Sequence, residues 1–117
     1  MTQRILTAAS KAHSSGVTVL TATGELDYHT ATELRAAVDD AAFTADGTVI
    51  DLSGLTYCDS TGLTVLVTAY QRAQAAGSPL ALAGLSADLT HVFEIVGLDQ
   101  LFTLSPTTEE AIKSLRR

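Results

Sequence analysis

The pair Asp59–Ser60 offers the most suggestive chemistry in this chain. It stands in YCDSTGLTVL, residues 57–66, between a run of β-forming residues and an amphipathic segment. This pattern predicts that a strand ends at Asp59 and that a helix begins after Ser60. A serine at that point can accept a hydrogen bond from a backbone N–H of the first helical turn, and its hydroxyl can also be modified. The local pattern favours the N-cap role for Ser60 and leaves the second role open.

The two residues before Ser60 each allow two interpretations. Asp59 either orients the Ser60 hydroxyl, or ends the strand and favours the helix start through its charge. Cys58, next to a helix N-terminus, could have a lowered pKa, but its neighbours Tyr57 and Asp59 supply no positive charge. We therefore expect Cys58 to be a small packing residue.

Recognisable catalytic motifs do not occur in the sequence. It contains no GxSxG, HExxH or GxxxxGK[ST] motif and no paired metal-ligand cluster. His13, His29 and His91 are far apart and stand beside a hairpin, a loop and a helix, which argues against a Ser-His-Asp triad. Ser86 resembles a simple N-cap. We expect a binding module, not an enzyme, that needs no metal or other cofactor.

Size, charge and cysteine content narrow the partners and the compartment. With 117 residues and 12.2 kDa the chain has room for one domain. A net charge of -6 and seven scattered Lys and Arg argue against nucleic acid. One cysteine cannot form an internal disulfide, and MTQRILTAAS has no apolar run suited to a signal peptide or membrane span. We expect a cytoplasmic protein with a protein or small-ligand partner and no membrane contact.

Periodicity predicts the secondary structure along the whole chain. Two N-terminal strands, the second ending near Gly24, are joined around residues 13–16, and a helix follows in which Thr30 and Glu33 have the spacing of a capping box. The apolar face expected for this helix comprises Leu34, Ala37, Val38 and Ala41. The segments expected after it are a strand at 47–55, a helix at 61–77, a strand at 78–84, a helix at 86–97, a strand at 101–106 and a helix at 106–117.

Two of the later helices have apolar stripes that predict their buried faces. The helix at 61–77 is expected to end at Gly77 and to bury Leu63, Leu66, Val67 and Tyr70. The helix at 86–97 is expected to bury Leu89, Val92, Phe93 and Val96. The residues expected on the exposed faces of the first of these helices, as partner contacts, are Thr64, Thr68, Gln71 and Arg72.

The order of the elements indicates an α/β domain. Helices that alternate with strands require crossover connections, hence a mixed, mostly parallel sheet of about five strands with about four helices and an antiparallel N-terminal edge. Loops after the strands gather at one end of such a sheet. Asp27 and Ser60 are therefore expected at the same end.

Three stretches carry a resemblance to a known family. GELDYHTA at 24–31, VIDLSGLTYCDSTGL at 49–63 and VFEIVGLDQLF at 92–102 resemble the STAS domain, specifically the bacterial anti-sigma factor antagonists. The similarity covers nearly the whole chain. It implies that residues 1–117 form a single STAS domain.

The resemblance implies a phosphorylation switch at Ser60. In the family, this serine is phosphorylated by a partner that is both anti-sigma factor and serine kinase, and a metal-dependent serine phosphatase reverses the modification. The unmodified antagonist binds the anti-sigma factor and frees the sigma factor. Thr61 stands where many relatives have a second serine and is a possible secondary site.

The resemblance also suggests a partner-binding surface. Its expected members are Asp27, Tyr28, His29, Thr30, Asp59, Ser60, Thr61, Thr64 and Thr68. Asp27 and Thr30 have an alternative role, in which they only shape the turn and cap the helix. Phosphorylation is expected to block the surface without a large conformational change, because a helix N-terminus favours negative charge.

Three other functions stay open. A phosphate-independent STAS scaffold in a sensory or lipid-transport complex is the main alternative. The others are nucleotide or small-ligand binding at the strand ends, and a hydrolase with an unrecognised residue set. We expect a monomer, although pairing through a strand edge is compatible with the pattern.

Overall fold

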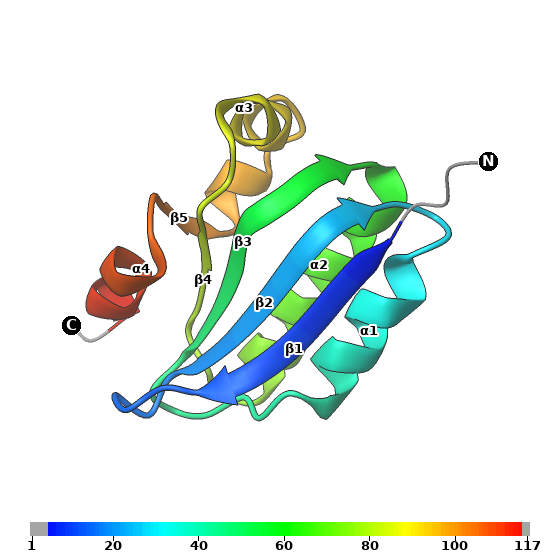
Figure 1. The fold of residues 1–117 in the computed structure, drawn as a ribbon. Helices are drawn as coiled ribbons and strands as arrows, with labels where there is room; N and C mark the ends of the chain where they lie inside the picture. Colours follow the sequence, from blue (N-terminus) through cyan, green and yellow to red (C-terminus); the bar gives the residue numbers. More distant parts are fainter. Residues whose placement is uncertain (1–4, 116–117) are drawn as a thin grey trace.

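A five-stranded sheet forms the centre of the computed structural model, which describes residues 5–115 (Figure 1). The strands are β1 (Leu6–Ala12), β2 (Thr18–Leu26), β3 (Thr48–Cys58), β4 (Leu80–Ala83) and β5 (Thr103–Ser105). They lie in the order β1-β2-β3-β4-β5. The β1–β2 pair is antiparallel and the other pairs are parallel. The expected mixed sheet with an antiparallel N-terminal edge is confirmed.

Within residues 5–115, four α-helices connect or follow the strands. They are α1 (Ala31–Asp40), α2 (Ser60–Ala75), α3 (Ala87–Ile95) and α4 (Thr108–Leu115). A short 3₁₀ helix, η1 (Leu98–Gln100), was not predicted. Every helix within residues 5–115 falls short of the combined length and apolarity that a membrane span requires.

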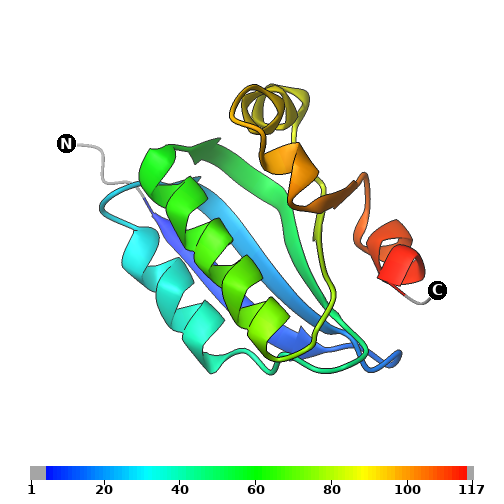
Figure 2. The same cartoon turned by 180° about the vertical axis from the view of Figure 1, so that it is seen from behind.

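The helices cover the two faces of the sheet unequally. Helices α1 and α2 lie side by side on one face (Figure 2), where the buried side chains include Leu20, Ile50 and Leu82. Helix α4 packs on the opposite face, where Ala111 and Ile112 belong to a second, smaller cluster of buried residues. The sheet thus has a large core under α1 and α2 and a small one under α4.

Two of the predicted apolar stripes need correction. In α2 the fully buried residues are Gly62, Val65, Leu66, Ala69 and Ala73. Leu63, Val67 and Tyr70 are only half-buried, because Leu63 and Tyr70 pack at the margin of the core and the ring of Tyr70 meets that of Phe102. In α3, Val96 is 53% exposed because the helix ends at Ile95 and the chain turns at Gly97 in a left-handed conformation.

Gly24 does not end β2 as expected. The strand continues to Leu26, and Gly24 lies inside it with a φ of +115°. A Cβ atom at this position would lie 2.2 Å from the carbonyl oxygen of Ile5, so the close approach of the β1 backbone requires glycine.

The predicted helix ends are correct in part. Ser86 caps α3, since its hydroxyl accepts a hydrogen bond from the Leu89 N–H at 3.2 Å. Gly77 adopts the expected left-handed conformation after α2, with a φ of +70°. The Thr30–Glu33 capping box is wrong, because the Thr30 hydroxyl donates backward to the Glu25 carbonyl at 2.7 Å and makes no bond to the helix amides.

Strand β3 extends well beyond its neighbour β4. Its ladder with β4 stops at the pair Asp51–Ala83, whereas its ladder with β2 continues to Cys58. Asp51 helps to end the shorter ladder, because its Oδ1 accepts the N–H of Ser53 at 3.0 Å. After β4 the chain leaves the sheet at Gly84, which has a φ of +78° and lies directly against Ser53 of β3.

Gly62 lets the first turn of α2 sit on the ends of β2 and β3. A Cβ atom there would lie 2.6 Å from Cγ of Leu26 and 2.9 Å from Sγ of Cys58. Both distances are shorter than any ordinary van der Waals contact. The absence of a side chain at this position therefore determines where the N-terminus of α2, and Ser60 with it, lies relative to the sheet.

We predict that Gly62→Ala destabilises the protein by about 1–3 kcal/mol, although alanine is the better helix former. The added methyl group would have to displace Leu26 and Cys58 from the core. Urea unfolding monitored by circular dichroism measures the change. Thr64→Ala, at an exposed position of the same helix, is the matched control and should change the stability by less than about 0.5 kcal/mol. Equal stability of the Gly62→Ala variant and the wild type would contradict this close packing.

Candidate functional site

Asp59, and not Ser60, caps helix α2. Its Oδ1 accepts the N–H of Gly62 at 3.1 Å, and its carbonyl accepts the N–H of Leu63 at 3.0 Å. Ser60 is the first helical residue; it is exposed, and its hydroxyl makes no hydrogen bond to the residues that the structure describes. The prediction that Ser60 is the N-cap is therefore wrong.

The end of β3 explains why the N-cap of α2 is Asp59, one residue before the predicted Ser60. Because β3 ends at Cys58, Asp59 is the last residue with an extended backbone, at a ψ of -174°, and only such a residue can fold its side chain back over the helix amides. Aspartate and serine are equally good caps, so the sequence could not rank them. Of the two interpretations of Asp59, the geometry supports its role in starting the helix.

Asp27 and Thr30 hold the neighbouring loop between β2 and α1. Asp27 is only 5% exposed, and its Oδ1 accepts the N–H groups of His29 and Thr30 at 2.9 and 3.0 Å. Thr30 is 4% exposed and binds the Glu25 carbonyl and the Asp27 N–H through its hydroxyl. These bonds support the turn-shaping role, and partner contact by either residue stays a prediction.

Tyr28 and His29 project from the same loop. Tyr28 is 75% exposed, and its ring meets that of His29 edge to face at 5.6 Å between centroids. The turn that Asp27 and Thr30 hold thus presents an aromatic pair to solvent. An exposed tyrosine held on an ordered loop is a typical anchor for a protein partner.

Large apolar side chains on the surface gather at this end of the molecule. Those exposed among the described residues are Ile5, Tyr28, Tyr57, Ile95 and Val96. Ile5 lies beside the end of β2, because its carbonyl accepts the Glu25 N–H at 3.0 Å. Both views place α3, which ends in Ile95, at the same end of the sheet as the tip of β3 (Figures 1 and 2). We call this surface, together with Ser60, the Ser60 end.

The aliphatic part of the Ser60 end was not predicted from the sequence. A signal was present in VFEIVG, since four apolar residues within five positions cannot all lie on one face of a short helix. Phe93 occupies the core, and Ile95 and Val96 are left outside.

The threonines of α2 line the helix beyond Ser60. Thr64 is exposed, while Thr61 and Thr68 are half-buried. The hydroxyls of Thr64 and Thr68 donate to the carbonyls of Ser60 and Thr64 at 3.0 and 3.1 Å, so they present methyl groups and acceptor lone pairs to solvent. Arg72, another expected contact, pairs with Asp39 of α1 at 2.7 Å and keeps 47% of its side chain exposed, so its contact with a partner stays a prediction.

Cys58 is the packing residue that the sequence predicted. Burial, and secondarily the negative charge of Asp59, raise the pKa of its thiol to about 12. Its Sγ lies 3.6 Å from the Asp59 carbonyl oxygen. The thiol stays protonated at neutral pH and is a poor nucleophile.

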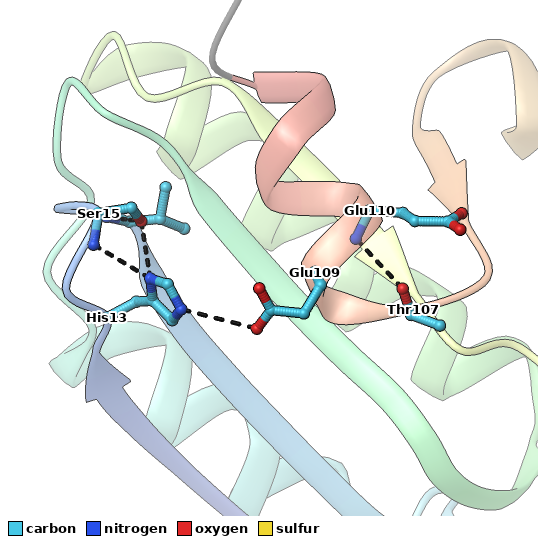
Figure 3. Close-up of polar contacts among 6 residues, drawn as sticks. His13, Ser15, Thr107, Glu109 and Glu110 are labelled. Atoms are coloured by element: carbon cyan, nitrogen blue, oxygen red, sulfur yellow. Dashed lines mark hydrogen bonds and ion pairs between the residues drawn. The ribbon is translucent and has the colours of Figure 1, made fainter.

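The three histidines lie apart, but one of them joins a serine and a carboxylate. Ser15 lies with its Oγ 2.9 Å from Nδ1 of His13, whose Nε2 is 3.7 Å from Oε1 of Glu109 (Figure 3). The Ser15 backbone N–H also donates to Nδ1 at 3.1 Å, and the Val17 N–H donates to the Ser15 hydroxyl at 3.3 Å. These bonds are those of an ordered hairpin turn that touches the start of α4.

Two further features of residues 5–115 bear on metal and ligand binding. No group of three or more His, Cys, Asp or Glu residues there could hold a metal ion. A cavity of about 260 Å³ lies beside β4, lined by Leu82, Leu85, Thr90, Leu104, Ser105 and Pro106. Without a charged side chain, this lining is poorly suited to the phosphates of a nucleotide.

Comparison with known proteins finds one family and many relatives. The sequence profile of the STAS domain matches residues 8–111. The anti-sigma-B factor antagonist of Listeria monocytogenes is 39% identical over 83 residues, which are 69% of this chain and 72% of that protein. The anti-sigma-B factor antagonist of Bacillus subtilis is 32% identical over 90 residues, or 77% and 83% of the two chains.

A solved structure resembles the fold over nearly its full length. The crystal structure of an anti-sigma factor antagonist from Mycobacterium paratuberculosis has a TM-score of 0.85 and 26% identity. The match covers 97% of this chain and 96% of that one.

We predict that Asp59→Ala costs about 0.5–2 kcal/mol of stability, because the Gly62 N–H loses its acceptor. Asp59→Asn keeps an acceptor and should lose less than about 0.5 kcal/mol, and Ser60→Ala should fall within the same limit. Urea unfolding of the four proteins at pH 7 measures these differences. A loss of stability in Ser60→Ala as large as that in Asp59→Ala would show that Ser60, and not Asp59, caps the helix.

We also predict that iodoacetamide alkylates Cys58 roughly 1000-fold more slowly in the folded protein than in the urea-unfolded chain at pH 8. The reason is that a thiol with a pKa of about 12, in place of 9.0, has about that much less thiolate at this pH. The rate in the folded protein should keep rising with pH above about 10, where that of the unfolded chain levels off because its thiol is almost fully ionised. Intact mass spectrometry follows the reaction, with Cys58→Ser as the unreactive control. Equal rates in the two states would contradict the raised pKa.

Proposed function

The chain belongs to the STAS domain family, and on that premise we propose that it is an anti-sigma factor antagonist controlled by phosphorylation of Ser60. In its unmodified form it binds an anti-sigma factor that is also a serine kinase, and the sigma factor is released. Phosphorylation of Ser60 ends this binding, and a metal-dependent serine phosphatase restores it. The protein acts by binding, as a regulator in the cytoplasm, and carries out no catalysis of its own.

The observation that carries the proposal is the free, exposed hydroxyl of Ser60 at the start of α2. Since Asp59 caps the helix, modification of Ser60 breaks no bond that the fold needs. A kinase can reach the hydroxyl without unfolding the helix.

A phosphate is also compatible with the helix start. It adds a charge of about -1.5 to -2, and the positive end of the helix dipole and the unbonded N–H groups of the first turn favour that charge. The carboxylate of Asp59 is a like charge beside it, but this carboxylate is held by the Gly62 amide and the phosphate is free to extend into solvent. We therefore propose that the fold of the phosphorylated protein is the same as that of the unmodified one.

The exposed apolar residues of the Ser60 end are suited to the partner surface. Exposed aromatic and aliphatic side chains at one end of a small protein are suited to the apolar centre of a protein–protein contact. Tyr28 and His29 project from a held loop, and Ile95 and Val96 add aliphatic area. Thr61, Thr64 and Thr68 extend the surface along α2, and Asp27 and Thr30 support it from below.

Phosphorylation acts on this surface by desolvation and like charge. A dianion on Ser60 that is buried against apolar groups and beside Asp59 loses its water without gaining a cation. Such a mismatch costs several kcal/mol, and about 3–4 kcal/mol weakens binding by two to three powers of ten. No conformational change is needed.

We predict that incubation with Mg-ATP and lysate of the source organism adds one phosphoryl group to the wild-type protein and none to Ser60→Ala. Intact mass measures the gain, and peptide mapping assigns it to Ser60. Ser10→Ala is the control, since it removes an exposed hydroxyl of β1 outside the proposed partner surface and should leave the modification unchanged.

The Ser60→Ala protein then serves as bait for the kinase. The kinase that it retains should bind unmodified protein at least about 100-fold more tightly than the phosphorylated form, as measured by calorimetry. Absence of modification in lysates of both growing and stressed cells would contradict regulation by phosphorylation of Ser60 and favour a phosphate-independent STAS scaffold.

A further inference from the structure

The tip of β3 has one side that no strand of the described chain occupies. Beyond Asp51 the strand pairs with β2 alone, because β4 ends at Ala83. Figure 1 shows β3 continuing past the point where the chain of β4 turns away toward α3. The open side runs along residues 54–58 and ends two residues before Ser60.

The direction of the backbone groups can be assigned from the end of the strand. The Asp59 N–H donates to the Leu26 carbonyl of β2 at 3.1 Å. Successive residues of a strand direct their N–H and C=O groups to alternate sides, so those of Cys58 point away from β2 and those of Tyr57 toward it. Among residues 5–115, no backbone group of another segment bonds to Cys58 on that outer side.

This internal edge differs from the two outer edges of the sheet. Proteins protect exposed strand edges with charged residues, proline, β-bulges or very short strands. Strand β1 carries Lys11, and β5 has only three residues. The stretch SGLTYC at 53–58 contains neither a charged residue nor proline, and its exposed Thr56 is a strong β-former. Its register with β2 shifts between Asp51 and Gly54 and again between Leu55 and Tyr57, and is regular at Tyr57 and Cys58, the end of the strand nearest Ser60.

We infer that residues 54–58 accept one extended segment of a protein partner, which joins the sheet as an added strand beside β3. Backbone hydrogen bonds supply the contact, as in other cases of strand addition. β-Branched residues in the segment would pair well with Thr56 across the two strands.

Charge identifies the kind of segment and excludes a second copy of this chain. The segments next to the edge, residues 51–59 and 84–96, contain Asp51, Asp59, Asp88 and Glu94 and no Lys or Arg. An added strand must therefore lack acidic residues and is favoured by a basic one. Two copies would bring these acidic segments together.

Strand addition would explain how the anti-sigma factor of the proposed function binds this chain beside the phosphorylation site. It rests on that function only for the identity of the partner. Cys58 and Ser60 are two residues apart, a span of about 7 Å, so a segment docked on the strand reaches the hydroxyl. The test below uses no kinase and no phosphate, so the two proposals can fail separately.

Amide hydrogen exchange by NMR tests the inference with a capped seven-residue peptide that alternates threonine and valine between terminal lysines. In the free protein the Cys58 amide should exchange fast. At a free peptide concentration ten times the Kd, it should exchange about tenfold more slowly. The Tyr57 amide, which faces β2, is the internal control and should exchange slowly in both states.

Two control peptides separate strand addition from other binding. A peptide N-methylated at every second residue cannot complete the ladder and should leave the Cys58 exchange rate unchanged. A peptide with terminal glutamates should bind at least about fivefold more weakly at low salt. Any one of three results would overturn the inference. They are no binding up to about 5 mM peptide, slowed amide exchange in β1 in place of β3, or a peptide-free protein in which dimerisation already slows the exchange of the Cys58 amide.

Discussion

The contact between Gly62 and the ends of β2 and β3 is the constraint on which the site depends. A helix of this length must pack its face of small and aliphatic residues on the sheet, and its first turn lies directly over Leu26 and Cys58. Only a residue without a side chain permits that approach. The start of α2 is therefore held close to the strand ends, and the residue two positions before Gly62 is carried to the rim of the sheet, where it faces solvent.

Side chains around this rim divide into those that hold the backbone and those that are presented to solvent. Asp59 bonds to the first turn of α2, and Asp27 with Thr30 bonds to the loop before α1. These polar groups are satisfied within the fold. Ser60, Tyr28 and His29 are left to project from the framework that the others maintain. An ordered framework lowers the entropy lost on binding, which is why such residues are effective contacts even in a small domain.

The early end of β4 shapes the same region of the sheet. Had β4 matched the length of β3, the tip of β3 would be an inner strand, and α3 would have to begin farther from the core. Instead the turn at Gly84 brings Leu89 and Phe93 of α3 onto the core face, while Ile95 and Val96 stay outside. One short strand thus produces both an accessible edge on β3 and an apolar surface near Ser60.

The amino-acid sequence by itself determined the order of strands and helices, the mixed sheet and the end of the molecule at which Asp27 and Ser60 meet. Those features follow from local periodicity, and from the rule that parallel strands end at the same edge. The tertiary structure alone decided that Asp59 caps α2, that Thr30 bonds backward to Glu25, and that Val65 and Ala69 are fully buried while Leu63 and Val67 are not. Each of these outcomes depends on where one element stops relative to another. Aspartate and serine are equal as caps, and neighbouring stripes of a helix are equally apolar, until packing against the sheet selects between them.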